Sequence, residues 1–142
     1  FRARLKLLEE FRDGLGLRDR VHFLGHLDDA TFGAVWSRAG ALVFPSLSEG
    51  FGIPLLEAMR FGVPILAARA GSIPEVAGDA ALLVDATDPR AIAEALRRLA
   101  IREDLREDLV ARGRVRLIDF SLELEAGRLA HLLEAAARHR TP

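Results

Sequence analysis

The sequence predicts a parallel α/β fold, in which strands and helices alternate along one chain. Residues 41–44 and 64–68 are short apolar runs without a charge, which is typical of strands that are buried on both faces of a parallel sheet. Segments with helix-start and helix-stop residues separate these runs, so each strand is followed by a helix. With 142 residues, of which 50% are hydrophobic, the chain has room for one domain around a continuous core.

The N-terminal part of the sequence predicts a helix, a strand and a second helix. The first helix has apolar residues on one face, and Gly14 and Gly16 end it at a turn. Residues 21–25 are a short run rich in β-forming residues, and we expect a strand there. Asp28 or Asp29 is expected to cap the second helix, because an aspartate side chain can accept hydrogen bonds from the first free N–H groups of a helix.

The alternation of strands and helices continues through the rest of the chain. The expected elements are a strand over residues 41–44, a loop over 45–52, a helix from near Pro54 to Gly62, a strand over 64–68, a helical turn over 73–77 closed by Gly78, and a strand over 81–84. Three C-terminal helices follow: one is capped by Asp88 and starts with Pro89, one covers residues 103–116, and one runs from Ser121 to about residue 137.

Charge and composition exclude several classes of partner. Twenty basic and twenty-one acidic residues give a net charge of −1, so no overall positive field exists to hold nucleic acid or an anionic membrane. The sequence has no cysteine, and therefore no disulfide framework or thiolate metal site. No apolar run approaches the ~20 residues that cross a bilayer, and we expect no signal peptide. We therefore expect a cytoplasmic protein without a nucleic-acid partner.

The loop over residues 45–52 has the features of an anion site. In an open parallel sheet, ligands bind beyond the carboxyl ends of the strands, and this loop follows such an end. Gly50 and Gly52 let the backbone approach a ligand closely, and the next helix directs free N–H groups and its positive dipole end to the same place. Glu49 lies in the loop and Glu57 in the first turns of the helix, so both carboxylates can face one ligand. On its own this spacing is a weak signal, because glutamate is common in the chain.

A larger set of residues resembles the donor-binding domain of family 4 glycosyltransferases. The matching segments are Phe44-Pro45-Ser46, Glu49-Gly50-Phe51-Gly52, Pro54, Glu57-Ala58-Met59, Gly62-Val63-Pro64 and Pro74-Glu75-Val76-Ala77-Gly78. Residues 21–25 resemble the preceding strand of the family, and Phe120-Ser121 resembles its closing helix, where Leu122 stands in place of a common Trp. The resemblance implies a Rossmann-like parallel sheet with C-terminal helices, as part of the C-terminal domain of the two-domain GT-B fold.

The resemblance also assigns roles to individual residues. Glu49 would be the catalytic residue and would accept hydrogen bonds from hydroxyl groups of the donor sugar. Glu57 would hold the ribose hydroxyls, and Leu27 lies where the family holds the nucleotide base, although packing is the commoner role of such a leucine. The residues whose backbone would contact the sugar and the diphosphate are Gly50, Phe51, Gly52 and Ile53. Fixed N–H donors of this kind stabilise the negative charge that builds up on a leaving diphosphate.

The function that the resemblance implies is transfer of a hexose from a nucleotide diphosphate sugar to an acceptor, with retention of the anomeric configuration. It implies neither a cofactor nor a metal, and the sequence has no Asp-x-Asp motif, the usual cation site of the other main glycosyltransferase fold. Two alternatives stay open. One is a nucleotide-sugar epimerase or a phosphorylase of the same fold, and the other is a binding or assembly module that keeps the pocket without catalysis.

The resemblance implies further that residues 1–142 form part of a nucleotide-sugar-binding domain. In the family, an Arg and a Lys that bind the diphosphate precede the segment matched here, and a separate N-terminal domain binds the acceptor. We therefore expect an N-terminally truncated donor domain that is inactive alone, from an enzyme in the cytoplasm or at the inner face of the membrane. The strand over residues 41–44 would then have an open edge, so we expect a homodimer or strand exchange.

Overall fold

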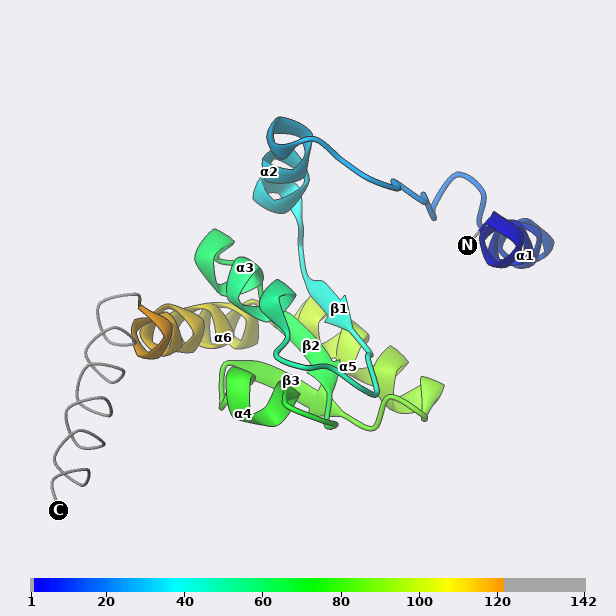
Figure 1. Ribbon diagram of the computed structural model, residues 1–142. Coiled ribbons are helices and arrows are strands. Elements are labelled where there is room, and N and C mark those ends of the chain that lie inside the picture. The colour runs from blue at the N-terminus through cyan, green and yellow to red at the C-terminus, as the bar shows by residue number, and fades with distance from the viewer. Residues whose placement is uncertain (1, 122–142) are drawn as a thin grey trace, which may run out of the picture. The chain divides into compact units, whose positions relative to one another are not determined.

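The computed structural model describes residues 2–121, and the chain divides into two compact units, Phe1–Ala34 and Val35–Pro142 (Figure 1). In the first unit, helix α1 spans Arg2–Gly14. Gly16 follows it with a φ of 68°, a left-handed conformation that glycine adopts without a steric penalty. The predicted first helix and its end are therefore confirmed.

Residues 21–25 have no regular structure, so the prediction of a strand there was wrong. A strand needs a neighbouring strand for its backbone hydrogen bonds, and the described residues of the first unit contain none. The side chain of Arg12 contacts the segment instead. Its guanidinium donates a hydrogen bond to the carbonyl of Val21 at 3.3 Å, and its Cζ lies 5.5 Å from the centre of the Phe23 ring. β-propensity alone was a poor guide to this segment.

Asp28 caps helix α2, which spans Asp29–Arg38. The Asp28 carboxylate accepts a hydrogen bond from the N–H of Thr31 at 2.7 Å. This bond stabilises the ionised carboxylate, and the pKa of Asp28 is therefore lowered from its ordinary value. The sequence predicted Asp28 or Asp29 as the N-cap of this helix, and the structure shows that it is Asp28.

The second unit contains a parallel sheet with the strand order β1-β2-β3. Its strands are β1 (Leu42–Phe44), β2 (Ile65–Ala68) and β3 (Ala81–Val84). Each of them lies within a run that the sequence marked as a strand. The predicted parallel α/β fold is confirmed.

Burial differs between the strands because of their positions in the sheet. Every residue of the central strand β2 is buried, as expected. Strand β1 forms an edge of the sheet within the described residues, and Val43 there exposes 39% of its surface. The expectation that residues 41–44 are buried on both faces was therefore wrong for this strand.

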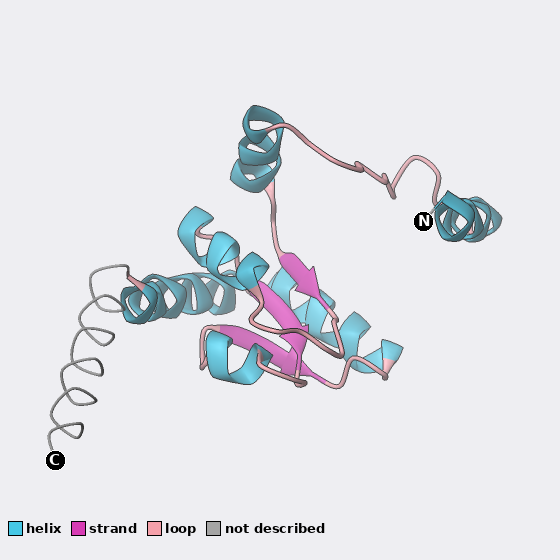
Figure 2. Ribbon diagram, in the orientation of Figure 1, coloured by secondary structure: helices cyan, strands magenta, loops and turns pink. Residues whose placement is uncertain are grey.

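Helices pack on both faces of the sheet (Figure 2). The helices of the second unit after β1 are α3 (Ile53–Phe61), α4 (Ile73–Ala77), α5 (Pro89–Ile101) and α6 (Glu103–Arg116), followed by the 3-10 helix η1 (Leu117–Phe120). Helices α3 and α4 contact β2 and share one hydrophobic core, while α5 contacts β2 and β3 and belongs to a second core. Helix α6 contacts both α3 and α5.

The side chains of residues 65–67 in β2 point alternately to the two faces of the sheet and so pack in different cores. Ile65 and Ala67 pack with Leu55 and Ile73, which come from α3 and α4. Leu66 points to the opposite face and packs with Leu99 of α5. One buried strand thereby joins the two helical layers.

The helix ends agree with the sequence signals. Gly62 ends α3 with a φ of 67°, and Gly78 follows α4. Asp88 caps α5 by accepting a hydrogen bond from the N–H of Arg90 at 2.8 Å, with Pro89 in the first turn. The 3-10 helix η1 was not predicted from the sequence. The helix predicted from Ser121 to about residue 137 lies, apart from Ser121, outside the described residues.

Across residues 2–121, none of the helices combines the length and the apolar character that a membrane span requires.

The contact between α3 and α6 predicts a specific packing defect. Gly113 of α6 is buried, and a Cβ at this position would lie 3.1 Å from Cγ of Met59. We expect Gly113→Val to lower the free energy of unfolding by about 1–3 kcal/mol, because the added atoms overpack the helix contact. Urea unfolding measures this change. Ala111→Val on the exposed part of the same helix is the control, and an equal effect of both variants would contradict the contact.

The pKa of Asp104 is the second quantity that the fold predicts. Arg102 donates a hydrogen bond to this carboxylate at 2.8 Å, and the pKa of Asp104 falls to about 2. Because the folded pKa is depressed, the pair stabilises the fold above the ordinary pKa near 3.8, and this contribution disappears as the pH falls through about 2.

An NMR titration of the Asp104 carboxyl carbon measures this pKa directly. Arg102→Gln is expected to return the pKa to about 4. Arg97→Gln is the control, because Arg97 pairs with Glu94 and does not contact Asp104. An unchanged Asp104 pKa in Arg102→Gln would show that the ion pair is not its cause.

Candidate functional site

The loop over residues 45–52 joins β1 to α3 at the carboxyl edge of the sheet. Since the three strands are parallel neighbours, the segments after β2 and β3 start at the same edge. The segment after β2 lies against the loop directly: a Cβ on Gly71 would be 3.5 Å from the backbone N and O of Glu49. Loops from two neighbouring strands therefore meet at Glu49.

The N-terminus of α3 has a backbone shape that glycine permits. Gly52 is the N-cap with a φ of 98° and a ψ of 46°, and its carbonyl accepts the N–H of Leu55 at 2.9 Å. Pro54, in the first turn, has no N–H group to leave unpaired. Within residues 2–121, no hydrogen bond is donated by the backbone N–H groups of Gly50, Phe51 or Gly52. These donors and the helix dipole can serve an anion.

Glu49 and Glu57 are both partly buried. Within the described residues, neither carboxylate takes part in a hydrogen bond or an ion pair. Glu57 lies four residues after Ile53 in α3, so the two side chains share one helix face. Ile53 is 63% exposed, which places this face on the accessible side of the helix.

Phe51 uses its backbone and its side chain differently. Its ring packs edge-on against Phe120, with the centroids 5.8 Å apart. Its carbonyl accepts a hydrogen bond from the Ser72 hydroxyl at 3.2 Å. The N–H group of Phe51 donates no hydrogen bond within residues 2–121 and can contact a ligand.

Leu27 is the one predicted site residue that lies in the first unit. It is partly buried and precedes the helix cap Asp28. The other predicted residues, Glu49 through Ile53 and Glu57, all lie on the loop and helix of the second unit.

A cavity of about 310 Å³ lies at the same edge of the sheet. Its walls come from the segments after all three strands, with Leu47, Arg69, Ala70, Asp85 and Ala86 as the lining. Arg69 donates a hydrogen bond to the carbonyl of Leu83 at 3.1 Å, which fixes one side of its guanidinium group. Hydrogen bonds from Thr87 lower the pKa of Asp85 and so favour its ionised form. The cavity therefore has a cationic side chain, Arg69, and an anionic one, Asp85, in its lining.

Sequence reasoning missed three residues that support the loop: two contact it directly, and Arg116 acts on it through the Phe120 ring. Ser72, Arg116 and Phe120 lie 20 or more positions beyond the residues of the loop that they support. No local pattern marks such distant partners. The resemblance at Phe120-Ser121 was the one available signal.

The parallel sheet, its helical layers and the loop at its carboxyl edge define a Rossmann-like α/β domain. Comparison with known proteins gives the family. The family model described as Glycosyl transferases group 1 matches residues 3–116, and the chain belongs to this family.

Curated relatives agree with this assignment. O-antigen chain mannosyltransferase B of Escherichia coli is 38% identical over 103 residues, covering 72% of this chain and 27% of that protein. Phosphatidyl-myo-inositol mannosyltransferase of Mycobacterium leprae is 34% identical over 125 residues, covering 86% of this chain and 33% of that protein. The chain thus spans 27% to 33% of the length of these two relatives.

Solved structures show the same fold. Sucrose-phosphate synthase of Thermosynechococcus elongatus superposes with a TM-score of 0.79 at 30% identity, covering 94% of this chain and 35% of that one. WaaG, a glycosyltransferase involved in lipopolysaccharide biosynthesis, gives a TM-score of 0.67 at 25% identity, covering 84% of this chain and 32% of that one.

Gly52 provides a test of the loop geometry. A Cβ at this position would lie 3.1 Å from Cδ1 of Leu55, in a backbone conformation with positive φ. We expect Gly52→Ala to lower the free energy of unfolding by about 1–2 kcal/mol. A Cβ at Gly50 would have no atom within 4 Å. Gly50→Ala should therefore change the free energy of unfolding by less than about 0.5 kcal/mol. Urea unfolding of the two variants measures these changes. Equal losses of unfolding free energy in Gly52→Ala and Gly50→Ala would contradict the observed loop geometry.

Proposed function

We propose that this chain is the donor-binding part of a retaining glycosyltransferase that moves a hexose from a nucleotide diphosphate sugar to an acceptor. The observation that carries the proposal is the accessible N-terminus of α3 after the loop over residues 45–52, in a chain of the group 1 family. Two of the relatives are named mannosyltransferases, which favours a hexose. The acceptor would bind to a part of the enzyme outside this chain.

The diphosphate is assigned to the N–H groups of Gly50, Phe51 and Gly52. When the bond between sugar and phosphate breaks, positive charge develops on the sugar ring and negative charge on the leaving diphosphate. Donors that are already fixed in place stabilise that negative charge without reorganisation, which lowers the barrier. The dipole of α3 contributes in the same direction, by about 0.3–1 kcal/mol.

The two carboxylates are assigned to opposite ends of the donor. Glu49, next to the N–H groups, would bind hydroxyl groups of the sugar close to the bond that breaks. Glu57, one turn into α3, would bind the ribose hydroxyls. No protein group competes for either carboxylate within residues 2–121, so both are available to accept hydrogen bonds from hydroxyls.

The division of roles predicts different kinetic effects of two substitutions. In an active enzyme that contains this chain, Glu49→Gln should lower kcat more than nucleotide affinity, by about tenfold or more, because a contact near the reacting bond strengthens in the transition state. Glu57→Ala should mainly weaken nucleotide binding, by about tenfold, since a hydrogen bond to a charged group contributes about 1.5–3 kcal/mol.

Steady-state kinetics and calorimetry with nucleotide sugars measure both effects. Glu107→Gln, on an exposed position of α6, is the control and should behave as the wild type. Equal losses of nucleotide affinity in both variants, with kcat unchanged, would reject the assignment of Glu49.

A further inference from the structure

We propose that Ser72 and Arg116 are positioning residues that aim the backbone N–H groups of Gly50 and Gly52 at the donor diphosphate. The proposal rests on the function proposed above for the loop. Neither residue is assigned a contact with the ligand. Both act through the loop over residues 49–52.

Ser72 holds two carbonyl groups of the loop. Its hydroxyl lies 3.0 Å from the carbonyl oxygen of Glu49 and 3.2 Å from that of Phe51. A hydroxyl has one proton, so it donates to one carbonyl at a time or is shared between them. Gly71 makes the approach possible, since its missing side chain lets the backbone come close to Glu49.

The direction of the N–H groups follows from peptide geometry. A trans peptide unit is planar, so the C=O of one residue and the N–H of the next point in opposite directions. The Glu49 carbonyl points to Ser72, and the N–H of Gly50 therefore points away from it. The same argument applies to the carbonyl of Phe51 and the N–H of Gly52. One hydroxyl thus orients two alternate N–H donors away from Ser72.

Arg116 supports the loop through two aromatic rings. Phe51 packs edge-on against Phe120, and the guanidinium carbon of Arg116 lies 5.0 Å from the centre of the Phe120 ring. Such a cation–π contact contributes about 0.5–2 kcal/mol. Asp119 fixes the guanidinium by accepting a hydrogen bond from Nη1 at 2.6 Å.

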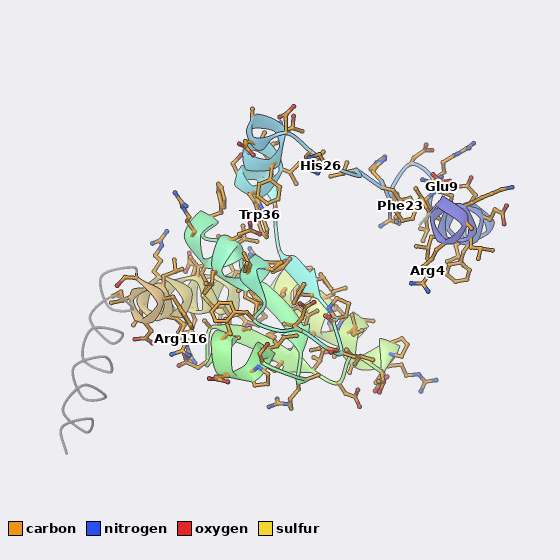
Figure 3. All side chains as sticks on the ribbon, viewed as in Figure 1. Arg4, Glu9, Phe23, His26, Trp36 and Arg116 are labelled. Carbon is orange, nitrogen blue, oxygen red and sulfur yellow. The ribbon has the colours of Figure 1, made fainter. Side chains whose placement is uncertain are left out.

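Arg116 also connects Phe120 with the helix that follows Ser72. It lies at the end of α6 next to α4 (Figure 3), where Nε donates to the carbonyl of Val76 at 3.1 Å and Nη2 donates to that of Glu75. Helix α4 begins directly after Ser72. The contacts therefore form a closed ring, from the loop through Ser72 and α4 to Arg116, and back through Phe120 to Phe51.

The first test measures the order of the loop without a ligand. In the wild type, ¹⁵N relaxation should give order parameters of about 0.85 for the amides of Gly50 and Gly52, typical of rigid backbone. In Ser72→Ala these values should fall below about 0.6, while β2 and α5 stay rigid. Ser72→Thr keeps the hydroxyl and should restore the wild-type values. Unchanged loop order in Ser72→Ala would overturn the proposal.

The second test uses a matched pair of arginines on α6. Arg116→Met should lower the order parameters of the loop, whereas Arg112→Met should not, because the side chain of Arg112 pairs with Asp108 and Asp79. If Ser72→Ala fails to fold, the comparison of Arg116→Met with Arg112→Met still tests the proposal. A fall in order over the whole second unit, rather than in the loop, would show a merely structural role and would overturn the proposal.

Binding of UDP and GDP, each in turn, provides the third measurement. Ser72→Ala should weaken the affinity about three- to tenfold, with recovery in Ser72→Thr. A wild type that binds neither nucleotide would count against the proposed function, while the order parameters still decide whether Ser72 and Arg116 position the loop. Loss of loop order in Ser72→Ala without loss of affinity would overturn their role toward the diphosphate.

Discussion

The burial of β2 is the constraint on which the rest of the second unit depends. This strand pairs with β1 on one side and with β3 on the other, and the side chains of residues 65–67 alternate between two hydrophobic cores. Leu66 packs in one core and Ile65 in the other, and almost no surface of either residue is exposed. A shift of β2 by one residue would exchange the two sets of side chains, so the register is strongly specified.

The fixed register in turn determines where the loop over residues 45–52 lies. Parallel pairing brings the end of β1 next to the end of β2, and the segments after these strands then meet at Glu49. The fold therefore supplies the position of the loop, while contacts from Ser72 and Phe120 supply its local shape. Precision at such a site depends on the groups that surround it as well as on the groups that contact the ligand.

Sequence reasoning succeeded where the signal is local. Gly62 and Asp88 mark helix ends through their own backbone or side chain, and the structure confirms both. Residues 21–25 failed because a strand requires a partner that a local pattern does not supply. The roles of Ser72 and Arg116 were beyond prediction for the same reason, since their partners are distant in sequence and the hydroxyl and guanidinium groups carry no positional signature of their own.

In the segment Gly50-Phe51-Gly52, the side chain of Phe51 holds the loop in place, and the backbone supplies the N–H groups. Phe51 anchors the loop, since its ring packs against Phe120 and its carbonyl binds Ser72. The flanking glycines carry no side chain that would cover their N–H groups, and Gly52 in addition needs the positive φ that starts α3. An aromatic anchor between two glycines therefore holds the peptide chain firmly, while the N–H groups of both glycines donate no hydrogen bond within residues 2–121. Without the anchor, a free glycine-rich loop would have to lose more conformational entropy in order to bind any ligand.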